Sequence, residues 1–276
     1  MAMTAFITEN ASWIRLSCFL AVFMLMALWE VWRPCRDLVA DKTVRWLNNL
    51  GLLVLNTVLL RLLFPSAAAG MAHFAAEHGY GVLNYLAVPA WLALLVTLVA
   101  LDFVVWAQHV FFHAVPNLWR FHRVHHADPD FDVTTGTRFH PVEIVLSMAI
   151  KLAAILLLGA AVEAVLIFEV LLNACAMFNH GNVQLPTAAD RVLRLLVVTP
   201  DMHRVHHSIE TDELNANFGF NLSCWDRWFG TYRAQPRGGH HDMRIGIRAL
   251  NAPREVCWLW GLLMLPFKSL KDANQP

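Results

Sequence analysis

The sequence is poor in charge. Of its 276 residues, 15% are Asp, Glu, Lys or Arg and 57% are hydrophobic. Soluble domains carry about 25% charged residues, so this composition indicates a membrane protein. The 21 basic and 21 acidic residues cancel, and no excess of positive charge points to a nucleic acid partner.

Paired cysteines, internal repeats and low-complexity tracts are also missing. The five cysteines are scattered without a C-x-x-C pair, which excludes a zinc-thiolate site and a disulfide framework, so we expect buried thiols without a functional role. Nucleotide-binding glycine motifs and a haem-binding cytochrome module are not found either. Histidine, by contrast, is abundant, and ten of the 14 histidines lie between His109 and His207.

Long apolar runs predict helices that cross a bilayer, which takes about 20 predominantly apolar residues. We expect crossings at residues 13–32 and 47–64, and a longer helix at 82–112 that continues beyond the membrane. A helical hairpin over 142–178, broken near Gly159, would return to the side from which it enters. The first run has no basic segment before it and no small-residue cleavage site after it, so we interpret it as a spanning helix.

The placement of Lys and Arg predicts the orientation. Residues 1–12 and 62–119 contain neither, whereas the loop between the first two crossings holds four basic residues and the chain is basic again from Arg120. Because basic loops stay in the cytoplasm, we expect the N-terminus and the 65–82 loop outside and the histidine-rich region in the cytoplasm.

The positions of the apolar runs divide the chain into three expected parts. Residues 1–100 are expected to form spanning helices with short loops, 101–232 to hold the histidines together with the hairpin, and 233–276 to form a tail. In the tail, 235–241 is expected to be a loop, and the short apolar segment 255–267 is expected to lie on the membrane surface.

The histidines recur at helical spacing. His109 and His113 are four residues apart and share one helix face, with Asp102 about two turns earlier on nearly the same face. The pentapeptide His-Arg-Val-His-His then occurs twice, at 122–126 and 203–207, and each copy places three imidazoles on one face. A single such triplet is consistent with ordinary core or surface histidines, but two triplets and a further pair argue against that interpretation.

Both pentapeptides are expected to lie on helices. Asn117 is a plausible N-cap for the first helix, and Asp128 followed by Pro129 a plausible stop. Thr199 followed by Pro200 combines an N-cap with a proline at the first helical position and opens the second helix.

Eight histidines on three helical faces exceed the four to six ligands that one ion binds, so the pattern predicts two metal ions. Neutral imidazole suits zinc, iron, copper and nickel. The chain has neither the H-E-x-x-H motif of zinc proteases nor the Glu-x-x-His pairs of soluble di-iron proteins. A di-zinc membrane hydrolase remains an alternative. A histidine-rich metal transporter is another, although it predicts ligands that are spread through the spans.

The motif order resembles that of the fatty acid hydroxylase and sterol desaturase superfamily, whose members carry His-x3-His, His-x2-His-His and a distant second His-x2-His-His. RFHPVE at 138–143 resembles the H-P-x-E element of these proteins, and FNHGN at 178–182 their H-x-N element. NFG at 217–219 and WDRWFGTY at 225–232 resemble their N-Y-G and W-D-x-x-F-G-T stretches. The resemblance covers about half of the chain. Phe218 replaces the usual Tyr and Gln108 a usual His, and neither departure removes a ligand.

The resemblance implies an all-α fold, in which a multi-span membrane helical domain lies under a cytoplasmic helical cap that carries a histidine-rich di-metal site. It also implies two iron ions, O2 as co-substrate and an external electron-donor protein of the ferredoxin or cytochrome type. The implied metal ligands are His109, His113, His122, His125, His126, His180, His203, His206 and His207.

Further residues are candidates for supporting roles. His140 is either a ligand, a partner of a ligand or a structural residue. Asn217 is expected to order the loop near the third histidine motif. Metal-bound histidines also need acceptors for their second ring nitrogen. The candidate acceptors are Asp102, Glu143, Asp212 and Asp226. We expect the WDRWFGTY stretch to serve packing, and His240 and His241 to lie in a solvated turn.

These features predict an O2-dependent hydroxylase or desaturase of a membrane lipid such as a sterol or fatty acyl chain. His113 follows the end of a span closely, so the site is expected just beneath the cytoplasmic leaflet, where a lipid can enter sideways into a dry pocket. Electrons are expected from a separate protein. Hydroxylation, desaturation and ether cleavage remain alternatives, and the oligomeric state is left open.

Overall fold

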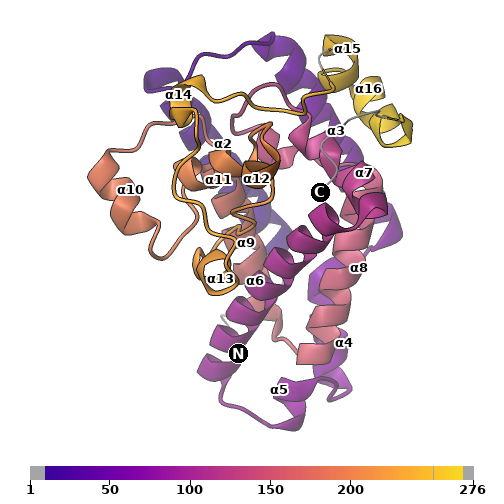
Figure 1. The fold of residues 1–276 in the computed structure, drawn as a ribbon. Coiled ribbons are helices and arrows are strands. Elements are labelled where there is room, and N and C mark those ends of the chain that lie inside the picture. The colour runs from indigo at the N-terminus through magenta and orange to yellow at the C-terminus, as the bar shows by residue number, and fades with distance from the viewer. Residues whose placement is uncertain (1–9, 251, 270–276) are drawn as a thin grey trace.

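The fold follows from long apolar segments that become helices. The computed structural model describes residues 10–250 and 252–269 (Figure 1), and within these ranges the regular structure is helical apart from three isolated bridges. This confirms the expected all-α class. Five stretches are long and apolar enough to cross a membrane: Ala11–Trp32, Lys42–Tyr85, Ala90–Ala114, Pro141–Leu158 and Val162–Asn179.

The second of these stretches contains more helix than expected. It begins with α3 (Lys42–Leu63), but the predicted external loop folds into α4 (Ala67–Glu77), and α5 (Val82–Tyr85) follows. The expectation of a loop at 65–82 was therefore wrong. Ala68 and Ala72 lie four residues apart and are fully buried, and these small side chains let α4 pack closely against the hairpin.

The long helix predicted at 82–112 is broken. Its main part is α6 (Ala90–Ala114), which begins directly after Pro89, while the short α5 ends at Tyr85. Proline disfavours a helical conformation in the residue before it and has no N–H to donate, so it separates the two helices and opens the second one.

The hairpin forms as predicted, from α8 (Pro141–Leu158) and α9 (Val162–Asn179). Gly159 ends α8 in the left-handed conformation, with φ of 68°. Both helices bury charge as well as apolar surface. Glu169 of α9 accepts from Arg15 of α2 (Ala11–Trp32) at 2.5 Å and from Lys151 of α8 at 3.1 Å, so the carboxylate is paired in a region where an isolated charge is costly.

Short helices and loops cover one end of this bundle. They include α7 (Pro116–His126), η1 (Thr135–Thr137), α10 (Thr187–Leu193), α11 (Pro200–His206), α12 (Thr211–Leu214) and α13 (Cys224–Trp228). Figure 1 shows α7, α11 and α12 gathered at that end and α5 at the opposite end. We refer to residues 116–140 and 180–250 as the cap.

Of the two cap helices whose starts were predicted, α11 begins where expected and α7 does not. Thr199 caps α11 and accepts from the Met202 N–H, as expected. α7 begins at Pro116 instead of after Asn117, because proline is well suited to the first helical position.

The tail is less extended than expected. The predicted loop at 235–241 contains the start of α14 (Gly239–Asp242). α15 (Pro253–Val256), α16 (Leu259–Met264) and η2 (Leu265–Phe267) follow, and Leu262 and Leu265 pack on α3 and α7. Trp258 and Trp260 stay exposed, and the placement of this segment on the membrane surface stays a prediction.

Substitution of Gly159 can test how closely the turn of the hairpin is packed. A Cβ at this position would lie 2.6 Å from the Tyr80 carbonyl oxygen, whereas a Cβ at Gly79, which also has a positive φ of 65°, would meet nothing. Gly79→Ala should cost about 1–2 kcal/mol from backbone strain alone. Gly159→Ala should lower the thermal unfolding midpoint in detergent clearly further. Equal midpoints for the two variants would contradict the close packing.

Candidate metal centre

The nine predicted ligands come together from four places in the chain. α6 supplies His109 and His113 near its end, α7 carries the first pentapeptide, and α11 with the residue after it carries the second. His180 directly follows α9. All nine imidazoles are buried, and they form two groups of possible metal ligands in which the ligand atoms lie within 4.8 Å of one another.

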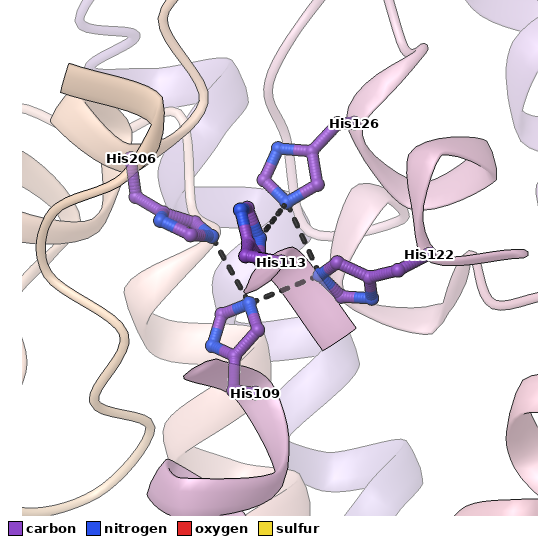
Figure 2. Close-up of side chains that lie close together, drawn as sticks. All are labelled: His109, His113, His122, His126 and His206. Carbon is purple, nitrogen blue, oxygen red and sulfur yellow. Dashed lines mark hydrogen bonds between the residues drawn. The ribbon is translucent and has the colours of Figure 1, made fainter. Parts of the chain in front are cut away.

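The first group has five members: His109, His113, His122, His126 and His206. Figure 2 shows their rings converging on one point from α6, α7 and α11. The Nε2 atom of His109 lies 3.0 Å from those of His122 and His206. The Nε2 atom of His126 lies 3.1 Å from that of His113 and 3.2 Å from that of His122.

The second group has four members: His125, His180, His203 and His207. The Nε2 atom of His180 lies 3.2 Å from that of His125 and 3.1 Å from that of His203. Both ring nitrogens of His207 are buried without a hydrogen-bond partner among the described residues. Each pentapeptide therefore contributes to both groups, because its three histidines fan out over the helix face.

Backbone carbonyls determine which ring nitrogen carries the proton. Nδ1 of His109 contacts the Phe218 carbonyl at 2.7 Å, and Nδ1 of His206 contacts the Ala216 carbonyl at 2.7 Å. A carbonyl can only accept, so each Nδ1 donates and, in a neutral ring, each Nε2 presents a lone pair. In the second group, the Arg138 and Ala176 carbonyls hold His125 and His180 in the same way, at 3.2 and 2.8 Å.

These lone pairs face one another at a distance that fits a shared cation. Two nitrogens bound at about 2.1 Å to one ion, at right angles, lie about 3.0 Å apart. Without a cation, the lone pairs of His109 and His206 would repel each other in a dry interior. The residues present therefore fit one metal ion in each group.

Burial keeps these rings neutral at pH 7. It lowers the pKa of His122 to about 3 and that of His180 to about 4, because the charged form would lose its hydration. Burial and the neighbouring imidazoles also lower the pKa of His206 and His207 well below the ordinary value. A neutral imidazole is the form that binds zinc, iron, copper or nickel.

Of the four carboxylates suggested as acceptors for the imidazole rings, Glu143 is the one that contacts a ring. Its Oε1 lies 2.6 Å from Nδ1 of His122, from the first turn of α8. Asp212 is instead half exposed and pairs with Arg233 and Arg237. The expectation for Asp212 was therefore wrong, because in the short helix α12 its side chain is directed to the surface arginines.

Asp102 and Asp226 also contact no histidine, so their expected role was wrong as well. Asp102 accepts from Trp225 Nε1 at 2.8 Å, and Asp226 accepts from Trp106 Nε1 at 3.1 Å. Backbone carbonyl oxygens accept from the histidine rings in place of these two aspartates. Sequence reasoning could not find these acceptors, because every residue has a carbonyl.

Asn217 and His140 both serve local structure. Asn217 has a φ of 55°, and its side chain bonds to Met202 of α11 and to Arg233, which orders the loop as expected. His140 lies outside both groups. Its Nδ1 caps α8 by accepting from Val142 N at 3.1 Å, so the structural interpretation fits and the ligand interpretation does not.

Two features near the site were missed or misread. Arg45 of α3 is fully buried, binds Asp128 and Asp132 at 2.7 Å each, and so anchors the loop that carries the Arg138 carbonyl. Arg45 is one of the four basic residues from which the orientation was predicted, and the three aspartates at 128, 130 and 132 are the sequence signal for its ion-pair role. His240 is also less solvated than expected and lies 3.4 Å from Arg204.

A helical bundle long enough to cross a membrane, with two groups of buried histidines at one end, defines a multi-span membrane metalloprotein. The chain belongs to the fatty acid hydroxylase family, whose model matches residues 94–231, half of its length. This confirms the family inferred from the motifs.

Relatives of known activity match about half of the chain. Ornithine lipid hydroxylase OlsE of Rhizobium tropici is 33% identical over 148 residues, which cover 54% of this chain and 44% of that protein. Alkylglycerol monooxygenase of Homo sapiens is 27% identical over 49% of this chain and 29% of its own. Cholesterol 25-hydroxylase of Rattus norvegicus is 26% identical over 55% and 49%. The match thus spans less than half of each relative, and no solved structure matches significantly.

A substitution in either histidine group should remove the metal ion of that group. His206→Ala removes a candidate ligand from the first group and His207→Ala one from the second, so each should lower the metal content from about two ions per chain to one or fewer. His140→Ala should keep both ions, because His140 caps a helix. Plasma mass spectrometry of purified protein measures this. Full metal content in either ligand variant would contradict the assignment.

Glu143 should tune the affinity of the first group. Glu143→Ala removes the partner of His122 and should weaken metal binding about 10- to 100-fold, as is typical for such partners. Glu143→Gln keeps an oxygen acceptor and should lose less. Competition with a chelator measures both affinities, and Glu163→Gln on α9 is the control. If Glu143→Ala kept the affinity of the unmodified protein, the carboxylate would have no such role.

Proposed function

We propose that this protein is an O2-dependent di-iron hydroxylase of a membrane lipid. The observation that carries the proposal is the pair of histidine groups, in which neutral imidazoles aim their lone pairs at two neighbouring points. The family supports it, because the three relatives are named as hydroxylases or monooxygenases of an ornithine lipid, an alkylglycerol and cholesterol.

The nine histidines would hold two iron ions. When bound, the iron pair supplies the activation of O2 and the removal of hydrogen from an unreactive C–H bond. The protein itself fixes five of the nine ligands through four carbonyls and Glu143, and it excludes water. Phe220 contributes to this dryness, since its ring lies 5.2 Å from that of His109 and 5.7 Å from that of His203, at the border of the two groups.

A di-zinc hydrolase fits the site less well. Hydrolysis needs a base that is free to take a proton from water. Glu143 is the one described carboxylate in contact with either histidine group, and its Oε1 is already paired with His122 Nδ1 at 2.6 Å. A transporter would spread its ligands along the spans, whereas these histidines gather at one end of the bundle.

The substrate and the setting of the reaction are part of the proposal. A lipid fits a site at the end of membrane-spanning helices, and the names of the relatives favour hydroxylation over desaturation. We propose that the site faces the cytoplasm, which the distribution of Lys and Arg supports. We also propose that a separate ferredoxin or cytochrome supplies electrons, as the family resemblance implies.

Lipid profiling under 18O2 tests the reaction. Cells with the intact protein should accumulate a lipid that carries one labelled oxygen in a new hydroxyl group. Cells with His206→Ala should lack this lipid, because the first metal group has lost a ligand. His241→Ala, an exposed position, is the matched control and should keep the product. A product without label would contradict the oxygenase reaction, and an identical profile in the His206→Ala cells would contradict the role of the site.

A further inference from the structure

The short helix α13 lies against the side of α6. The ring of Phe229, directly after α13, stacks on that of Trp106 with centroids 4.6 Å apart. Trp225 contacts Phe103 at 5.0 Å. Trp228 is 71% exposed and Phe229 55%, so much of this aromatic surface has no partner among the described residues of the chain. The contacts that these rings do make are apolar, so no charged partner explains why Trp228 and Phe229 are exposed.

The depth of α6 shows what surrounds these rings. α6 has 25 residues, which at 1.5 Å per residue is about 37 Å, while the hydrocarbon core is about 30 Å thick. Leu95 and Phe103 lie about 8 and 20 Å from the Ala90 end, so a core placed anywhere along α6 contains both. Residues that pack beside them therefore lie at hydrocarbon depth too.

A cap segment at that depth must satisfy its own polar groups, because lipid chains offer no hydrogen bonds. Two buried carboxylates do this here. Asp226 accepts from Phe218 N and Gly219 N at 2.9 Å each and from Thr231 Oγ1 at 2.7 Å, besides the Trp106 indole. Asp102 of α6 accepts from the Trp225 indole and from Leu222 N at 3.2 Å.

The exposed apolar surface continues beyond α13. Leu195 and Leu196, just after α10, are 69% and 67% exposed. The Leu196 carbonyl accepts from Ser223 N at 3.1 Å, which joins this segment to the start of α13. The edge of the cap next to α6 thus presents leucine and aromatic side chains where a water-facing edge would present polar ones.

Between α13 and α6 lies a groove of about 650 Å³, lined by apolar side chains that include Val99, Phe103 and Trp228. We propose that α13 is inserted into the bilayer and that this groove binds an acyl chain of a membrane phospholipid. The depth of α6 identifies the occupant, because lipid chains fill any open space at that level. The inference depends on α6 spanning the bilayer and not on the reaction at the metals.

Photocross-linking in phosphatidylcholine vesicles tests the insertion. The metal-loaded protein with Trp228→p-benzoylphenylalanine should gain the mass of one phospholipid on irradiation. The same substitution at Gln235, an exposed cap residue, should gain none. Absence of lipid adduct at Trp228, or cross-linking to a second copy of the chain instead, would overturn the proposal.

A second substitution distinguishes a groove from a surface that merely faces lipid. Ala100 lines the groove, and Ala100→Trp should fill it and remove most of the lipid adduct at Trp228. Val54→Trp, on the exposed side of α3, should leave the adduct unchanged. Both variants should keep their metal content, which shows that they fold. An unchanged adduct in the Ala100→Trp protein would overturn the groove.

Discussion

The structure depends on holding ring-nitrogen lone pairs face to face. In a dry interior, the Nε2 atoms of His109 and His206, 3.0 Å apart, repel each other unless a cation lies between them. The fold imposes this arrangement through carbonyl acceptors behind the rings. Metal binding and the stability of the cap are therefore coupled, since the folded cap creates the repulsion and the bound ions remove it.

Much of the cap serves to keep those acceptors in place. Arg45 reaches from α3 into the loop after α7, where burial alone would raise the pKa of Asp128 but Arg45 and Arg138 hold it at about 2. Asp226 acts similarly at the other side of the site, because it binds the N–H of Phe218, whose carbonyl orients His109. Ion pairs and carboxylates that contact no metal ligand thus determine where the ligands point.

The relatives are named for an ornithine lipid, an alkylglycerol and cholesterol, and the family model matches the histidine-bearing residues 94–231 of this chain. This suits a division of roles, in which the buried histidines support one kind of chemistry and apolar surfaces around them select the lipid. In this chain, one apolar surface close to the histidine-bearing part of the fold is the groove between α6 and α13.

The sequence by itself determined the helical class, most of the spans and the set of nine converging histidines, because helix periodicity is local and places residues three and four apart on one face. Only the tertiary structure decided that His122 and His126 belong to one group and His125 to the other, since that depends on how α7 meets α6 and α11. It also decided that carbonyls and Glu143 support the rings, while Asp102 and Asp226 bind indoles. Hydrogen-bond partners far apart in the chain depend on packing, which no local pattern encodes.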